Sequence, residues 1–94
     1  MAGEAKVDAE IIYCVPWQHL GTAAWTANEL FAQGGKDVSI KITPGVAGVF
    51  QVFLDGEKVF DRKEEGNIFP DLTRVKQMRA TLQEKINAAP VAAD

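Results

Sequence analysis

The chain contains a single cysteine, Cys14, which ends the apolar run 11–13 and precedes a segment of helical character. The amino end of a helix carries unpaired N–H groups and a partial positive charge, and both favour the thiolate, which is the nucleophilic form of cysteine. A second cysteine three residues later would release a mixed disulfide internally, but that position holds Trp17. The pattern predicts a thiol that forms mixed disulfides and depends on an external thiol to resolve them. The alternative is that Cys14 is a small buried apolar residue.

Four residues beside Cys14 complete the candidate site. Val15 and Pro16 separate the cysteine from Trp17, which could plug the site or form a contact surface. His19 is the only histidine in the chain. It could assist the thiol as a base or a cation, and the alternative is a partly exposed residue of the loop or first helical turn.

Composition excludes several function classes. A net charge of −3 and a pI of about 5.1 argue against nucleic acid and against anionic membranes as partners. One cysteine and one histidine give no metal-ligand spacing, and no glycine-rich phosphate loop follows a strand. Glu64 and Glu65 are interpreted as a solvated loop and not as an acid and base pair. We therefore expect no metal or cofactor and, without an apolar signal segment, a cytoplasmic location.

Hydrophobic periodicity predicts one domain over residues 9–87, with loose ends at 1–8 and 88–94. Strands are predicted at 9–14 and 37–42, two more within 49–63, and helices at 21–35 and 71–86. The first three elements should form a right-handed βαβ unit with parallel strands. The predicted apolar stripes are Leu20, Ala23, Ala24, Ala27, Leu30 and Phe31 in the first helix, and Leu72, Val75, Met78, Leu82 and Ile86 in the second.

Asp55-Gly56 predicts a hairpin, because this pair favours the type I′ turn of two-residue loops. With that two-residue loop, the predicted pairs across the hairpin are Leu54 with Glu57, Phe53 with Lys58, Val52 with Val59 and Gln51 with Phe60. One face of the hairpin would then carry Phe50, Val52, Leu54 and Val59. The other face would carry Val49, Phe53 and Phe60 among polar residues.

Together these segments resemble the selenoprotein W-like (SelT/SelW/SelH, or Rdx) family. The resemblance rests on the cysteine after the first strand, on Thr43-Pro44, on the closing amphipathic helix and on a hairpin pattern over residues 48–63. That pattern is carried by Gly48, Phe50, Val52, Asp55, Gly56, Val59, Phe60 and Lys63.

The resemblance implies an α/β fold of minimal thioredoxin-like type, β-α-β-β-β-α, with a four-stranded mixed sheet and two helices. It implies thiol redox chemistry, including reactions linked to glutathione, and redox-dependent binding of partner proteins. The first cysteine of the family motif corresponds to Cys14, and its second cysteine or selenocysteine corresponds to Trp17. Thr43 and Pro44 correspond to a family Thr-Pro whose proline often faces the redox site; trans is favoured for this bond, because few X–Pro bonds are cis.

Two functional hypotheses follow. In the first, Cys14 forms mixed disulfides with glutathione or with a thiol-containing partner protein. In the second, the chain is a non-catalytic interaction module that forms a homodimer or binds a heterologous partner. The candidate interface residues are Trp25, Phe53 and Phe60, because helices on one sheet face would leave the opposite face open.

Overall fold

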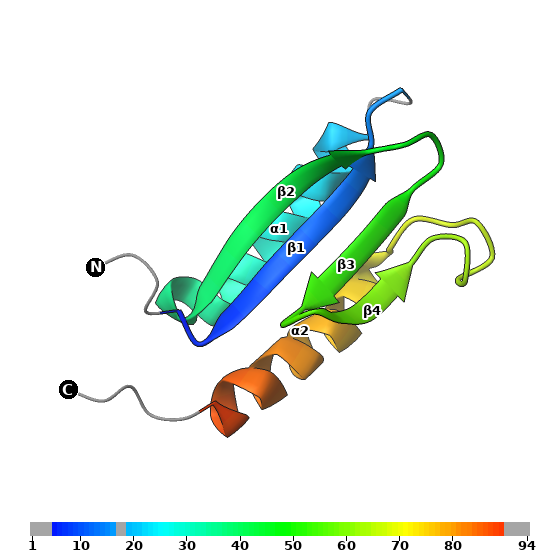
Figure 1. Cartoon of the computed structure of the whole chain (residues 1–94). Helices are drawn as coiled ribbons and strands as arrows, with labels where there is room; N and C mark the ends of the chain where they lie inside the picture. Colours follow the sequence, from blue (N-terminus) through cyan, green and yellow to red (C-terminus); the bar gives the residue numbers. More distant parts are fainter. Residues whose placement is uncertain (1–4, 17–18, 90–94) are drawn as a thin grey trace.

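A four-stranded sheet with both helices on one face makes up the described part of the chain, residues 5–16 and 19–89, in the computed structural model (Figure 1). The sheet order is β2-β1-β3-β4; β1 pairs in parallel with β2 and antiparallel with β3, which pairs antiparallel with β4. This is the predicted minimal thioredoxin-like arrangement. The elements are β1 Val7–Cys14, α1 Leu20–Gly34, a 3-10 turn Gly35–Asp37, β2 Val38–Gly45, β3 Phe50–Leu54, β4 Glu57–Asp61 and α2 Leu72–Ala88.

Strands β1 and β2 are both longer than predicted. β1 begins two residues early, because Val7 is buried and pairs with Val38 of β2. β2 continues to Gly45, because Pro44 pairs with Tyr13 of β1. Proline is tolerated there because β2 is an edge strand. No cis peptide bond occurs within the described ranges, so the bond before Pro44 is trans.

The apolar stripe predicted for α1 is only partly correct. The helix buries Ala23, Thr26 and Leu30, whereas Leu20, Ala24 and Phe31 are exposed. Thr26 is tolerated in the core because its hydroxyl donates to the Thr22 carbonyl at 2.8 Å. The buried stripe is narrower than predicted, because α1 contacts the sheet along one line and the side chains beside that line remain in water.

Helix α2 begins as the sequence predicts. The Asp71 carboxylate is its N-cap and accepts a hydrogen bond from the Arg74 N–H at 2.8 Å. Leu72 is exposed although it belongs to the predicted stripe, because it lies in the first turn beyond the edge of the core. The remaining stripe residues are buried as predicted: Val75, Met78, Leu82 and Ile86.

The hairpin turn is confirmed, but the pairing beyond it is not. Asp55 and Gly56 have φ of 51° and 81°, as a type I′ turn requires. Leu54 and Phe53 have their predicted partners, and then an irregularity between Val52 and Phe53 shifts the register.

The shift corrects the assignment of Phe60. Val52 pairs with Phe60 and not with Val59, so one extra residue on β4 turns the Phe60 ring into the core. Phe60 is 2% exposed and packs edge-on against Phe50, with ring centroids 6.1 Å apart. Phe60 is therefore a core residue, and its prediction as an interface residue was wrong.

Replacing Phe60 with alanine should lower the free energy of unfolding by about 3–5 kcal/mol, because the fully buried ring leaves a cavity. Phe53→Ala is the matched control and should cost less than about 1.5 kcal/mol, because its ring is partly exposed on the opposite face. Urea unfolding of both variants measures the difference. Equal losses would contradict the shifted register.

Candidate functional site

Cys14 is the last residue of β1 and is fully buried. Its carbonyl accepts a hydrogen bond from the His19 N–H at 3.2 Å, and His19 is the N-cap of α1. The cysteine therefore lies next to the amino end of the helix, where unpaired N–H groups favour a negative charge. The predicted junction between strand and helix is present.

The Cys14 sulfur has a hydrogen-bond donor that sequence reasoning missed. The N–H of Gly48, in the loop between β2 and β3, points at Sγ from 3.2 Å. Gly48 has φ of +83°, a conformation that favours glycine. The repeated glycines of this loop indicate a turn, but nothing in the sequence places the turn over the sulfur.

An aromatic and cationic cluster of His19, Phe69 and Arg62 lies beside the Gly48 loop. The Phe69 ring contacts the imidazole of His19 edge-on, with centroids 4.3 Å apart, and the guanidinium of Arg62 lies 5.1 Å from the Phe69 centroid. Arg62 also donates a long 3.4 Å hydrogen bond to the Gly48 carbonyl. The sequence patterns give Phe69 no role. In the structure it anchors the first turn of α1 to the loop that covers Cys14.

Hydrogen bonds to the Asp61 carboxylate fix the position of the backbone next to Arg62. This carboxylate accepts hydrogen bonds at 3.0 Å from the side chains of Gln51 and Lys58 and from the Lys63 N–H. The pKa of Asp61 is lowered from its usual value, chiefly by the Gln51 hydrogen bond and then by Lys58 and Lys63, while desolvation opposes the change. These contacts fix the end of β4 and so the start of the Arg62 side chain.

The other predicted site residues lie at varying positions. Val15 and Pro16 are exposed beside Cys14, whereas Trp17 lies outside the described residues. Opposite Cys14 in β2 stands Gly45 and not Thr43 or Pro44. The Thr43 hydroxyl instead donates to Glu10 at 2.6 Å.

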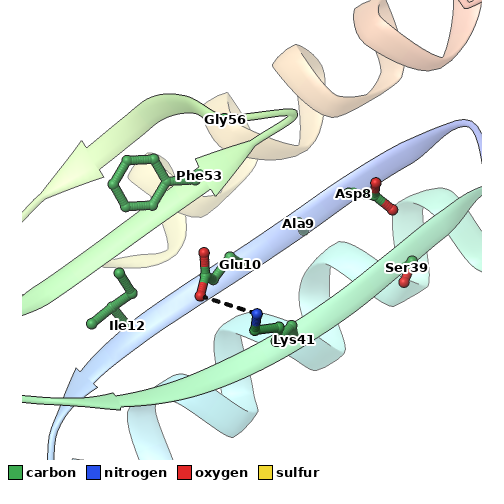
Figure 2. Close-up of a pocket in the computed structure, with 8 residues that line it drawn as sticks. All are labelled: Asp8, Ala9, Glu10, Ile12, Ser39, Lys41, Phe53 and Gly56. Atoms are coloured by element: carbon green, nitrogen blue, oxygen red, sulfur yellow. Dashed lines mark ion pairs between the residues drawn. The ribbon is translucent and has the colours of Figure 1, made fainter.

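The open sheet face carries a shallow depression of about 430 Å³ (Figure 2). Glu10 and Lys41 form an ion pair of 3.9 Å across it, and the Phe53 ring lies at its margin. Its lining residues are Asp8, Ala9, Glu10, Ile12, Ser39, Lys41, Phe53 and Gly56. None of these residues carries a thiol.

Neither a cluster of metal-ligating residues nor a membrane-spanning helix is present among the described residues. No group of three or more His, Cys, Asp or Glu residues there could hold a metal ion. None of the described helices has the length and apolar character needed to cross a bilayer.

Comparison with known proteins identifies the family. The model of the Rdx family matches residues 8–79, which include Cys14, Gly48, all of α1 and the first eight residues of α2. The chain belongs to the Rdx family. This family is associated with redox proteins of thioredoxin-like fold, in agreement with the sequence resemblance.

Two solved structures are similar to this Rdx-family chain. The selenoprotein W-related protein of Vibrio cholerae has a TM-score of 0.75 and 26% identity, over 86% of this chain and 98% of that one. A protein from Bordetella parapertussis has a TM-score of 0.71 and 35% identity, over 81% of this chain and 95% of that one. Among curated proteins, no sequence matches the chain.

Asp61→Asn should destabilise the protein at neutral pH and make no difference in strong acid. The pKa of Asp61 is lowered by folding from a usual value of 3.8, so its stabilisation is present above that value and is lost as pH falls through the lower folded pKa. Urea midpoints of both proteins between pH 7 and pH 2 measure this convergence. Glu64→Gln is the control and should have little effect at any pH, because its ion pair with Lys58 is exposed. A constant offset across the range would contradict the assignment.

Proposed function

We propose that this Rdx-family chain is a monothiol redox protein whose Cys14 forms a mixed disulfide with glutathione or with a cysteine of a partner protein. The observation that carries the proposal is the position of Cys14, which ends β1 beside the amino end of α1 and accepts the Gly48 N–H at its sulfur. Both features place backbone N–H groups beside the cysteine that would attack a disulfide. Family membership supports the same class of chemistry.

The proposed cycle has two thiol-disulfide exchanges. The Cys14 thiolate attacks the glutathione sulfur of a mixed disulfide between glutathione and a partner protein, the S–S bond breaks, and the partner cysteine leaves as its thiolate. Cys14 is thereby oxidised to a mixed disulfide. A second glutathione then attacks the glutathione sulfur of that disulfide, which regenerates the Cys14 thiolate and forms oxidised glutathione. The second step needs an external thiol, because Cys14 is the only cysteine of the chain.

Burial sets a condition on this reaction. Cys14 is 0% exposed, so a disulfide reaches its sulfur only after the covering structure opens. The Gly48 loop is one part of that cover, since its N–H contacts the sulfur directly. We therefore expect the folded protein to react more slowly than the unfolded chain, and the reaction to accelerate when the loop is weakened.

Complete burial of Cys14 also favours a second candidate function, a non-catalytic interaction module that keeps the fold. In that case Cys14 fills space in the core. The two functions differ in one measurable property, because only the first requires the thiol to react while the protein remains folded.

Folded protein incubated with oxidised glutathione should gain one glutathionyl group at Cys14, detected by intact-mass spectrometry. Reduced glutathione should remove it. Cys14→Ser is the control and should gain nothing. If the mass rises only in denaturant, Cys14 is a core residue and the interaction module is the better proposal.

Trp17→Cys should restore a pair of thiols at the spacing of the family motif. On oxidation the variant should lose two thiols per chain and form an internal disulfide, because the second sulfur displaces a bound glutathione. Thiol titration and intact mass measure this. The double variant Cys14→Ser/Trp17→Cys is the matched control and should remain a mixed disulfide. A persistent mixed disulfide in the single variant would show that position 17 does not resolve Cys14.

A further inference from the structure

The outer edge of β2 has no partner among the described strands, because β2 pairs only with β1. Backbone groups along a strand alternate between its two sides. In β1, Asp8 directs both its N–H and its carbonyl to Asp55, on the β3 side, so the odd residues of β1 face β2. The register between β1 and β2 then directs the backbone groups of Val38, Ile40, Ile42 and Pro44 outward.

The flank of α1 beside this edge is apolar and exposed. Leu20 and Phe31 are 52% and 59% exposed, and they lie on one line of the helix with Ala24. The opposite flank is used within the chain, where Glu29 forms an ion pair with Arg79 of α2 at 3.0 Å. The line of Leu20, Ala24 and Phe31 therefore lies on the side away from α2, and α1 lies behind β1 and β2 (Figure 1).

The edge and the flank form one surface. A Cβ at Gly34 would lie 2.7 Å from a Val38 methyl group, so the end of α1 meets the start of β2. From this meeting point α1 runs back along β2. Phe31 is three helical residues from Gly34, a rise of about 4.5 Å, and Ile40 is two strand residues from Val38, a rise of about 6.6 Å. Phe31 therefore lies at about the level of Ile40. Ile42 is 36% exposed on the same side of the strand.

A second copy of the chain is the occupant that fits this surface. Two antiparallel β2 strands related by a twofold axis satisfy each other's outward groups, because such an interface is self-complementary. With the axis at Ile40, Ile40 pairs with Ile40 of the second copy and Val38 pairs with Ile42. All three outward residues that have an N–H then form ladder bonds, and Pro44, which has none, falls beyond them.

Charge and hydrogen bonding disfavour the registers whose axis lies beyond Ile40, at Lys41 or at Ile42. With the axis at Ile40, Lys41 lies opposite Ser39 of the second copy. Moving the axis to Lys41 would place two lysines opposite each other, which is destabilising. Moving it to Ile42 would pair Ile40 with Pro44 and lose hydrogen bonds.

Helix spacing agrees with this arrangement. Neighbouring strands are about 4.8 Å apart, so the twofold axis between the two β2 strands lies about 2.4 Å outside each β2. A helix centred between β1 and β2 is then about 5 Å from that axis, measured in the plane of the sheet. The two α1 helices would then be about 10 Å apart, which is a packing distance for helices. Ala24 permits this approach, and Phe31 lies beside the axis.

We propose that two copies associate through antiparallel β2 strands and through the α1 flank formed by Leu20, Ala24 and Phe31, into one continuous sheet. Cys14 pairs with Gly45 at the far end of β2, so the two thiols lie at opposite ends of the dimer, away from its centre. The dimer is therefore independent of the proposed redox function. Lysine and proline on an edge strand can also prevent strand pairing. If the protein is a monomer, Lys41 and Pro44 have that protective role at the edge of β2.

Sedimentation velocity of the full chain under reducing conditions, over a range of concentrations, tests the proposal. The wild type should form a dimer, and Phe31→Asp should weaken dimerisation at least tenfold. Leu72→Asp is the matched control and should have no effect, because this leucine is similarly exposed, at 53%, and lies at the start of α2. A monomeric wild type, or a Phe31→Asp variant as dimeric as the control, would overturn the proposal.

Disulfide trapping locates the axis. In a Cys14→Ser background, Phe31→Cys should form a cross-linked dimer rapidly under mild oxidation, because the two residues meet near the axis. Leu72→Cys in the same background is the control and should cross-link slowly. Equal rates would overturn the assignment of α1 to the interface. Circular dichroism of each variant establishes that it is folded.

Discussion

Strand β1 is the element on which both the fold and the candidate site depend. It is hydrogen-bonded on both sides, to β2 and to β3, and its alternate residues Val7, Ala9 and Ile11 are buried beneath the helices. A strand held in this way cannot shift by one residue without exposing its apolar side chains. The position of Cys14 at its end is therefore determined by the pairing of the whole sheet.

Because both helices cover the same face of the sheet, the two faces carry different kinds of residue. The covered face holds the core and directs Phe50, Phe60 and Phe69 toward the Cys14 corner, through successive edge-on ring contacts. The open face places Glu10, Lys41 and Phe53 around a shallow depression. The depression has no thiol among its lining residues, and Cys14 is fully buried at the end of β1.

Local sequence signals predicted most of the fold. The order of elements, the parallel pair β1 and β2 and the Asp55-Gly56 turn all follow from short-range patterns, and the structure contains each of them. Boundaries were less accurate, because Val7, Thr43 and Pro44 join strands only through partners distant in the sequence. The exposure of Phe31 could not be predicted, because the apolar stripe of a helix does not reveal how much of the helix surface the sheet covers.

The amino-acid sequence by itself determined that one thiol stands at the junction of the first strand and the first helix, with Trp17 at the position of the family's second redox residue. Only the tertiary structure decided what surrounds that thiol. The Gly48 N–H reaches Sγ from 34 positions away, and a one-residue irregularity in the hairpin turns Phe60 from the open face into the core. Both depend on contacts between segments that are remote in the chain, and the periodicity of a single segment carries no information about them.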